Sequence, residues 1–369
     1  GMHLNLYRYQ GIWIMIDLGI VFAGTHIPGV DIMVPNIDAI TPYKNDIVGL
    51  VLTHAHEDHL GAVTYLWPEL GCPVYATPFT AAVLKVKLGE VGLQGKVKIH
   101  EVKAGEQYQL GPFGFEMVPI THSIPEMHAV ALRTDKGTIM HTGDWKLDEN
   151  PMVGVPTDET TLAKYGDEGV LAMVCDSTNV FVEGEAGSEA GVRVALGNLI
   201  QSLSGKIAVA CFASNVARMD TVIRAAQACG RKVALAGRSM HRMAAAARSV
   251  GLLQGIEPFI NDDQAKHLPE NEVLFLCTGS QGEARAALSR IADGSHPHVK
   301  LGQGDHVIFS SRVIPGNEIP IRNLQNKLAD RGVRLHTERD TPGIHVSGHP
   351  CREELRQMYQ WVRPQIAVP

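Results

Sequence analysis

An apolar run that ends in a cluster of histidines constrains the fold of this chain more than any other feature. Residues 50–63 read LVLTHAHEDHLGAV, so His54, His56, Asp58 and His59 directly follow a strand-like segment. Neighbouring imidazoles gain nothing on a solvated loop and repel one another once protonated, whereas a metal ion favours neutral imidazole and ionised carboxylate. Alternate residues can then face one ion while Asp58 and His59 turn towards a second. The pattern predicts a strand that ends in a metal site.

Four other apolar runs also end in polar residues. FEMVPI leads into His122, TIMHTGD ends at Asp144, VLAMVCD ends at Asp176, and GIHVSGH ends at His349. Each of these residues taken alone is explained at least as well by a turn or a cap. Ligands commonly gather outside the strand ends of sheets that are covered by helices. The recurrence therefore predicts that these ends assemble one site.

Length and composition indicate the class of protein. The 369 residues suggest roughly two domains, and a formal net charge of −6 gives no global attraction to nucleic acid. A local basic groove can still supply that attraction. The sequence contains no long apolar span or signal peptide, which predicts a soluble, cytoplasmic protein that does not bind membranes. The six cysteines form no CxxC pair, and we interpret them as reduced core residues rather than metal ligands.

The pattern of predicted elements changes along the chain. The first 115 residues mix short strands with turns, and LNLYRYQGIWIMIDLG predicts a hairpin around Gly11. From about residue 190 to 340, strands alternate with helices: KIAVACFA, KVALAG and EVLFLCTG precede ARMDTVIRAAQAC, SMHRMAAAARSV and GEARAALSRIA. This alternation is typical of a parallel sheet. No linker or repeat separates the two patterns, so the second domain is predicted to be an insertion in the first.

Several motifs carry a resemblance to a known family. THAHEDH, THSIPE and HTGDWK are similar to motifs of the metallo-β-lactamase superfamily. VCDSTNV, CFASNVARM, CTGSQGE, FSSRVIPGNE and HVSGHPCREEL resemble those of the β-CASP nucleases of the ribonuclease J type. The resemblance covers essentially the whole chain, and the motifs are specific in combination.

The resemblance implies an α/β protein, in which an αββα sandwich carries an inserted β-CASP domain with a parallel sheet and flanking helices. It implies a first part of the sandwich over residues 1–188, the insertion over 189–342, and a return to the sandwich over 343–369. The nuclease site is expected in the cleft between the two domains.

The same resemblance implies two divalent metal ions, with zinc favoured and manganese as the alternative. Carried over residue by residue, His54, His56 and His122 would hold one ion, Asp58 and His59 the other, and Asp144 would bridge them. Asp17 matches a position that supports the ligand shell, although a strand-end turn former explains it as well.

For function, the resemblance implies a ribonuclease of RNA processing and decay, acting as a 5′–3′ exonuclease, an endonuclease or both. The expected substrate is single-stranded RNA, preferably 5′-monophosphorylated, and the full-length protein is expected to be a homo-oligomer. Asp58, Asp176 and His349 are the candidate catalytic residues. His349 is expected to hydrogen-bond the phosphate and to help protonate the leaving group; the alternative is a capping histidine in a turn.

Other residues are candidates for contacts to RNA. Ser214, Ser280 and Ser347, with the amides of TGSQG, are predicted to bind the phosphate, although such loops often only turn the chain. Arg238 and Arg242 could line a channel for the backbone, or simply lie on a solvated helix face. The histidines that lack ligand spacing are interpreted as structural or surface residues: His128, His141, His241, His296, His298 and His306.

The chain departs from the family pattern at both ends. RPQIAVP is similar to a family strand that runs on into a His-bearing loop, which supplies the last ligand of the second ion. A family C-terminal domain and a Gly-rich segment before GMHLNLY are also missing. We therefore expect this sequence to be a segment of a longer protein, and we expect the 369-residue chain to bind its second ion weakly.

Three other functions compete with the ribonuclease. A flavo-diiron oxidoreductase shares the sandwich but usually carries Glu at the position of His56 and needs a flavodoxin-like domain. A glyoxalase- or lactamase-like hydrolase leaves the strand–helix insertion unexplained. The third alternative is an RNA-binding scaffold with an incomplete metal site.

Overall fold

The chain leaves one folded unit at residue 187 and returns to it at residue 348. The computed structural model describes residues 1–23 and 27–369. Unit 1 comprises Gly1–Glu149, Gly154–Ala186 and Gly348–Pro369, and unit 2 comprises Asn150–Val153 and Gly187–Ser347. The second unit is thus an insertion in the first.

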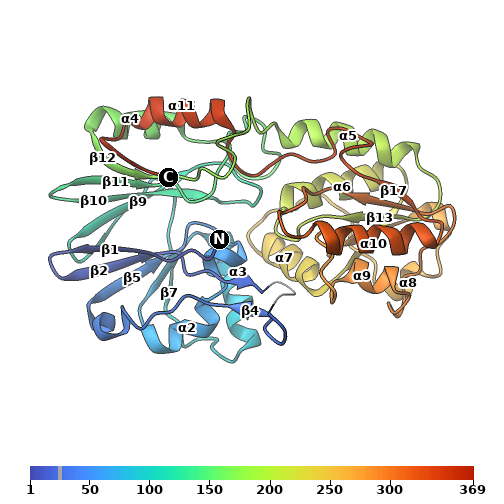
Figure 1. Ribbon diagram of the computed structural model, residues 1–369, viewed down its shortest axis with the longest axis horizontal. Helices are drawn as coiled ribbons and strands as arrows, with labels where there is room; N and C mark the ends of the chain where they lie inside the picture. Colours follow the sequence, from blue (N-terminus) through green and yellow to red (C-terminus); the bar gives the residue numbers. More distant parts are fainter. Residues whose placement is uncertain (24–26) are drawn as a thin grey trace. The chain divides into compact units, whose positions relative to one another are not determined.

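Unit 1 is built on two sheets that face each other (Figure 1). The first sheet has the order β1-β2-β5-β6-β7, with β1 Asn5–Tyr9, β2 Ile12–Ile16, β5 Ile47–Val51, β6 Val74–Ala76 and β7 Ile99–Glu101. The second has the order β18-β12-β11-β10-β9-β8, with β8 Gln107–Leu110, β9 Phe113–Pro119, β10 His128–Thr134, β11 Gly137–His141, β12 Val170–Val174 and β18 Ile366–Val368. A short ribbon pairs β3 Val21–Phe22 with β4 Ile32–Met33.

Helices cover the outer face of each sheet (Figure 1). The helices of this unit are η1 Thr41–Asp46, α1 Glu57–Leu60, α2 Val63–Leu70, α3 Pro78–Glu90, α4 Glu159–Glu168 and α11 Arg352–Val362. Between the sheets, Ile14, Val51, Phe115 and Leu132 belong to one buried cluster. A second cluster joins α4 and α11 to the outer face of the second sheet. The predicted αββα sandwich is confirmed, and so is the hairpin around Gly11.

The direction of the strands brings the predicted strand ends together. β2 and β5 run parallel. In the second sheet β9 and β11 are both antiparallel to β10, while β12 is parallel to β11, so β9, β11 and β12 run the same way. Their carboxyl ends therefore meet at one edge of that sheet, and those of β2 and β5 meet at one edge of the first.

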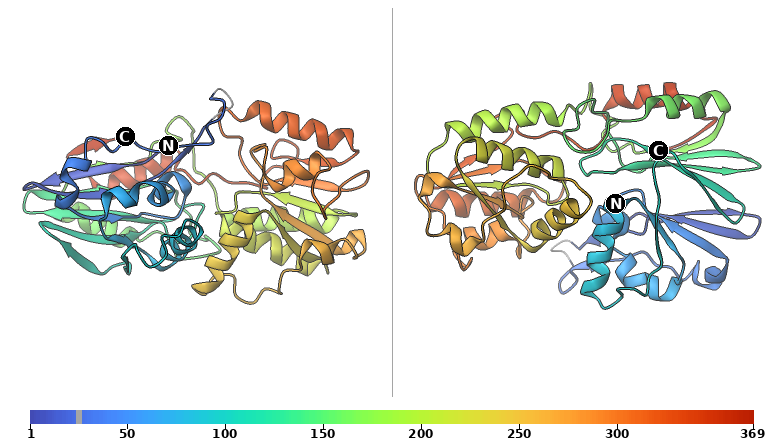
Figure 2. Two further views of the ribbon diagram at one scale, coloured as in Figure 1. Left: turned by 90° about the horizontal axis from the view of Figure 1, so that it is seen from below. Right: turned by 180° about the vertical axis from the view of Figure 1, so that it is seen from behind.

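Unit 2 is a parallel sheet with helices on both faces (Figures 1 and 2). Its strands have the order β14-β15-β13-β16-β17, with β13 Ile207–Ala210, β14 Lys232–Ala236, β15 Val273–Cys277, β16 His306–Phe309 and β17 Arg334–His336. Its helices are α5 Glu189–Ser202, α6 Val216–Ala228, α7 Arg238–Ser249, α8 Asp262–Ala265, η2 Glu270–Glu272, α9 Ala287–Ala292 and α10 Glu318–Asp330. Every strand pair in this sheet is parallel, as the alternation of strands and helices predicts.

Two local predictions are wrong. GIHVSGH does not form a strand: Ile344 is fully buried, but its carbonyl accepts a hydrogen bond from the Ser310 hydroxyl (2.7 Å) instead of joining a ladder. The segment GEARA is not helical, and α9 begins only at Ala287. There the Thr278 hydroxyl and carbonyl accept the amides of Ala287 and Leu288, which sets the start of the helix.

No helix in the described part of the chain is long and apolar enough to cross a membrane. All six cysteines are free; five are buried and Cys229 is half-buried, as expected for core residues.

Candidate metal centre and active site

Three imidazoles converge at the ends of β5 and β9. Nε2 of His54 lies 2.9 Å from Nδ1 of His56, and Nε2 of His122 lies 3.1 Å from the same atom. Two nitrogens bound to one tetrahedral zinc ion stand about 3.3 Å apart, given Zn–N bonds of about 2.0–2.1 Å. The three side chains predicted to share one ion are therefore brought together in an arrangement that fits it.

The neighbours of these histidines fix which ring nitrogen carries the proton. Thr53 donates its hydroxyl proton to Asp17, so its oxygen is left to accept from Nδ1 of His54 (2.9 Å). Nδ1 of His122 donates to the carbonyl of Gly348 (2.5 Å). In both rings the Nε2 lone pair therefore faces the cluster, which is the tautomer that a metal ion needs.

A second group of potential ligands lies beside the first. His3, Asp58, His59 and Asp144 each bring a ligand atom within 4.8 Å of the others. Nδ1 of His59 donates to the buried carboxylate of Asp17 (2.7 Å), so Nε2 is the ring nitrogen left to face a cation. This Nε2 lies 3.2 Å from Asp144, yet it is buried and forms no hydrogen bond within residues 1–23 and 27–369. An orphaned buried nitrogen beside two carboxylates fits a second cation.

The electrostatics of the two groups differ. Burial lowers the pKa of His54 and the pKa of His122 well below the ordinary value for histidine. It lowers the pKa of His56 to about 4, so these three rings are neutral. Burial would also lower the pKa of His59, but the carboxylates of Asp144 and Asp17 raise it well above its ordinary value. The first group is thus prepared for neutral imidazole ligation, and the second attracts positive charge.

His349 and Asp176 form a third group with Asp144. Nδ1 of His349 donates to Oδ2 of Asp176 (2.7 Å). The same oxygen lies 3.3 Å from the amide of Trp145, and Oδ1 of Asp176 accepts from the amide of Thr178 (2.9 Å). Burial would lower the pKa of His349, but Asp176 raises it. The ring of His349 lies edge-on to that of His122, with centroids 5.3 Å apart. His349 therefore stands beside the candidate metal ligands with its Nε2 directed away from Asp176.

Glycine at position 348 allows this approach. A Cβ there would lie 2.9 Å from Cε1 of His122 and from the hydroxyl oxygen of Ser123. Any larger residue would push the loop that carries His349 away from the histidine cluster.

The candidates for phosphate binding lie in unit 2. Ser214 follows β13 and Ser280 follows β15, at the carboxyl edge of the parallel sheet; Ser347 ends the unit. Ser214 and Ser347 are half-buried, whereas Ser280 is only 2% exposed, so the first two are the more accessible hydroxyls. In α7, Arg238 is exposed and Arg242 is half-buried.

A buried arginine organises the same edge. The guanidinium of Arg218, fully buried in α6, pairs with Glu189 (2.9 Å) and donates to the hydroxyl (2.6 Å) and carbonyl (2.9 Å) of Ser310. It also lies 3.3 Å from Nδ1 of His345. These contacts hold together α5, α6, the loop after β16 and the segment that leads to Ser347.

The sequence did not single out His3, Thr53 or Arg218. His3 has no ligand spacing, because its neighbours Met2 and Leu4 are not His, Cys, Asp or Glu and its partners are more than 50 residues away. Thr53 directly precedes the first histidine of the cluster. Its hydroxyl can accept from His54 only because the folded chain places Asp17 where it takes the hydroxyl proton. Arg218 lies within the quoted motif CFASNVARM, but nothing in the pattern shows that it is buried.

The histidines without ligand spacing lie outside the three groups. His128, His141, His296 and His306 are buried, His298 is half-buried and His241 is exposed.

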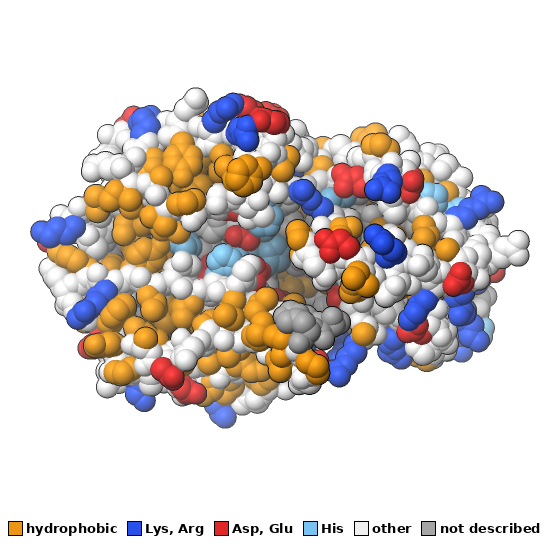
Figure 3. All heavy atoms as spheres, viewed as in Figure 1, with side chains coloured by type: hydrophobic (Ala, Val, Ile, Leu, Met, Phe, Trp, Pro, Cys, Tyr) orange, Lys and Arg blue, Asp and Glu red, His pale blue; other side chains and the backbone are white. Residues whose placement is uncertain are grey.

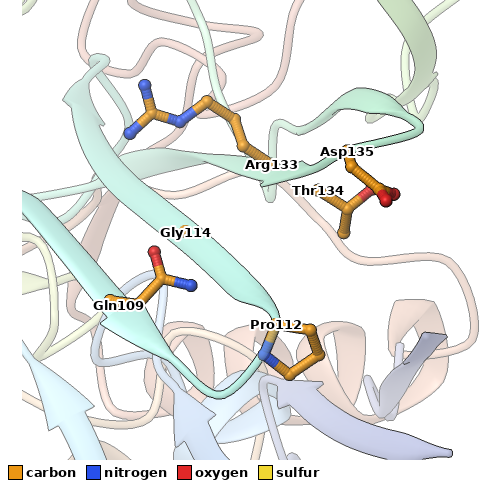
Figure 4. A pocket seen from close by; sticks show the side chains of 6 residues that line it. All are labelled: Gln109, Pro112, Gly114, Arg133, Thr134 and Asp135. Carbon is orange, nitrogen blue, oxygen red and sulfur yellow. The ribbon is translucent and has the colours of Figure 1, made fainter. Parts of the chain in front are cut away.

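Figure 3 shows histidine and acidic side chains gathered on one face of unit 1, between two bands of hydrophobic side chains. A separate pocket lies on β8, β9 and β10 (Figure 4). It is lined by Gln109, Pro112, Gly114, Arg133, Thr134 and Asp135. None of these residues belongs to the candidate site.

Two protein families match consecutive parts of the chain. Residues 28–197 match the family described as "Beta-lactamase superfamily domain", and residues 204–328 match "Ribonuclease J, beta-CASP domain". A solved structure titled "Crystal Structure of a Protein of Unknown Function from Enterococcus faecalis V583" has the same fold. It aligns with a TM-score of 0.67 at 18% identity, over 99% of this chain and 89% of that one.

Relatives that match the chain along its length share one name. The chain is 45% identical to "Ribonuclease J" of Sinorhizobium meliloti and 40% identical to that of Mycolicibacterium smegmatis, over 100% of this chain and 66% of each relative. It is 37% identical to "Ribonuclease J" of Helicobacter pylori strain J99, over 96% of this chain and 52% of the relative. The chain thus spans between about half and two thirds of the length of these relatives.

Proposed function

Because the chain belongs to the ribonuclease J family of the metallo-β-lactamase superfamily, we propose that it is a metal-dependent ribonuclease that hydrolyses phosphodiester bonds in RNA. The observation that carries the proposal is the convergence of His54, His56 and His122 beside a second group of ligand atoms. A family match alone would not distinguish a working site from a degenerate one, whereas three imidazoles aimed at one point support a metal centre.

The residues divide naturally between two ions. His54, His56 and His122 would hold the first, and Asp58 and His59 the second. Asp144 would bridge them: it lies in the group of Asp58 and His59, and its charge also acts on the three histidines of the first group. When bound, such ions would lower the pKa of a water molecule and withdraw charge from the phosphate oxygens. Imidazole with carboxylate suits zinc, which we favour, and also manganese.

The protein's own residues supply the remaining chemistry. Asp176 holds His349 through Nδ1 and so leaves Nε2 available to a phosphate oxygen or to the leaving 3′-oxygen. A protonated ring there would stabilise negative charge and deliver the proton that the leaving alkoxide needs. The neighbouring carboxylate of Asp176 favours that protonated form. We therefore assign His349 as the general acid and Asp176 as the residue that positions it.

The preferred substrate is single-stranded RNA with a 5′-monophosphate. The half-buried hydroxyls of Ser214 and Ser347 and the amides around Ser280 are the groups proposed to bind the terminal phosphate. The network around Arg218 supports this assignment for Ser347, because it holds His345 in the segment that leads to Ser347. We propose that the protein acts in the cytoplasm, where its six free thiols are kept reduced. We also propose that the full-length protein is a homo-oligomer.

A cleavage assay tests the function. Purified protein is incubated with single-stranded RNA before and after chelation and again after zinc or manganese is added back. The expected result is RNA cleavage that chelation abolishes and metal restores. His54→Ala should abolish cleavage, whereas His241→Ala, on the exposed face of α7, should not.

Cleavage that persists undiminished after the metal is removed would contradict the proposal. RNA binding without cleavage, in protein that has bound its metal, would favour the RNA-binding scaffold instead.

A further inference from the structure

We infer that His3 is a protein ligand of the second metal ion, beside Asp58, His59 and Asp144. The inference rests on the two-ion site proposed above and assigns it a residue outside the ligand set that the family resemblance implies. Its starting observation is that His3 brings a ring nitrogen into the same group of ligand atoms, all within 4.8 Å of one another.

The backbone holds His3 against the ligand loop. The amide of His3 donates to the carbonyl of Asp58 (2.9 Å), and the carbonyl of His3 accepts from the amide of Gly19 (2.8 Å). Gly19 permits this packing, because a Cβ there would lie only 1.5 Å from the carbonyl oxygen of Asp58. The position of His3 relative to Asp58 is therefore fixed by two main-chain hydrogen bonds within unit 1.

The Gly1 ammonium donates to Oδ2 of Asp58 (3.0 Å), but another atom of this group has no partner among the described residues. Nε2 of His59 is buried, forms no hydrogen bond in the described part of the chain, and lies 3.2 Å from Asp144 and 3.8 Å from Asp58. Nε2 of His3 lies 3.9 Å from Oδ2 of Asp58. Two imidazoles and two carboxylates around one point form the donor set of a tetrahedral zinc site.

The ring of His3 must turn to reach the ion. It now stacks on the ring of His59, with centroids 4.1 Å apart and planes inclined by 16°. Stacked rings direct their lone pairs side by side, so they cannot both point at one ion. The side chain of His3 is 35% exposed, which leaves room for rotation about the bonds to its ring. Stacking is weak compared with metal ligation, so a bound ion would favour the turned ring.

Two substitutions separate ligation from stacking. His3→Phe keeps an aromatic ring on His59 but removes the ligand nitrogen, whereas His3→Ala removes both. His100→Phe is the matched control, because His100 is also half-buried and also stacks on an aromatic ring of unit 1, that of Tyr75 (4.7 Å, 9°).

The measurement is metal binding, independent of activity. Metal-free protein is titrated with Co²⁺, and the visible absorption bands report the number and geometry of the bound ions; zinc affinity follows from competition with a chromogenic chelator. The full-length wild-type protein and its His100→Phe variant should bind two ions. In His3→Phe and His3→Ala the second ion should bind at least about tenfold more weakly, with a changed spectrum, while the first is unaffected.

Each other outcome overturns a specific claim. If His3→Phe binds the second ion as tightly as wild type while His3→Ala does not, His3 only supports the ring of His59. If both variants bind it normally, His3 has no part in the site. If the wild-type protein itself binds no second ion, the two-ion proposal fails, and this inference fails with it.

Discussion

At the scale of single residues, Asp17 connects the two groups of ligands. Its carboxylate is fully buried and accepts hydrogen bonds from the amide and hydroxyl of Thr53 (2.8 Å each) and from Nδ1 of His59 (2.7 Å). Through Thr53 it also sets the tautomer of His54. Its backbone is left-handed (φ 62°), an uncommon conformation for a residue other than glycine and one that clusters at functional sites. These contacts favour a supporting role over a simple turn.

The first prediction concerns this carboxylate. Asp17→Asn keeps the size of the side chain but replaces one acceptor by an NH₂ group. One oxygen of Asp17 accepts from the Thr53 amide and the other from the Thr53 hydroxyl and Nδ1 of His59, so Thr53 and His59 can no longer all be held as they are. Zinc affinity should fall by about 10–100-fold, as for other residues that orient metal ligands. Chelator competition measures the affinity, and the unfolding midpoint of the metal-free protein is the control for misfolding. An unchanged affinity would mean that Asp17 only shapes the turn after β2.

The second prediction separates His349 from the metal ligands. His349→Ala should lower the turnover number for RNA cleavage by roughly 10²–10⁴-fold, the range of a positioned acid or base. Metal content and RNA affinity should stay near those of the wild type, since neither requires the ring. Loss of metal in parallel with activity would make His349 a ligand and remove its assignment as the acid.

At the scale of elements, a single carboxylate holds together the loops that carry the site. Glu354, in the first turn of α11, accepts hydrogen bonds from the amides of Leu147, Ala186 and Cys351 (2.7–2.8 Å). Leu147 belongs to the loop of Asp144, and Cys351 to the loop of His349. Glu354 is only 2% exposed, so no water can replace it easily.

The third prediction follows from these contacts. Glu354→Ala would leave three amides without their acceptor and should lower the free energy of unfolding by at least about 3 kcal/mol, at about 1–3 kcal/mol for each buried group left unpaired. Glu353→Ala is the matched control, because Glu353 is exposed on the same turn of the same helix. Denaturant unfolding measures both. Equal, small effects of the two substitutions would show that the amides find other partners.

The sequence predicts elements well where the pattern is regular and local. The runs before His54, His122 and Asp144 are strands because apolar, β-branched residues fill them, and the polar residue after each run marks its end. GIHVSGH also contains β-branched residues but pairs with no strand among the described residues, so only the burial of Ile344 was predictable. The contacts of Glu354 join segments up to 207 residues apart and leave no trace in any local pattern.

At the scale of the whole molecule, the insertion was predictable because its strand–helix alternation contrasts with the mixed strands on either side. The parallel sheet of unit 2 follows from the same pattern. The pairing of Arg218 with Glu189 could not be predicted, because charged residues at helical spacing usually lie on a solvated face. The role of His3 was hidden for a similar reason: its partners Asp58 and His59 meet it only in the folded chain.

The fourth prediction concerns the substrate that the whole protein selects. Single-stranded RNA with a 5′-monophosphate should be degraded faster than RNA of the same sequence with a 5′-triphosphate or a 5′-hydroxyl. A pocket of hydroxyls and amides arranged for one phosphate is too small for a triphosphate. A 5′-hydroxyl leaves the same hydroxyls and amides without a partner. Ser347→Ala should reduce the difference between the three ends. Equal rates for all three ends in the wild-type protein would show that no such pocket selects the 5′ end of the RNA.

The central claim is that the protein is a two-metal ribonuclease with Asp144 between the ions, and one paired measurement on Asp144→Ala tests it most directly. Elemental analysis and RNA cleavage are carried out on the same preparations of the wild type and the variant. The full-length wild type should contain two divalent ions per chain and cleave RNA, whereas the variant should lose metal and cleavage together, because both ions depend on the bridging carboxylate. A variant that keeps the metal content and the cleavage rate of the wild type would contradict the account.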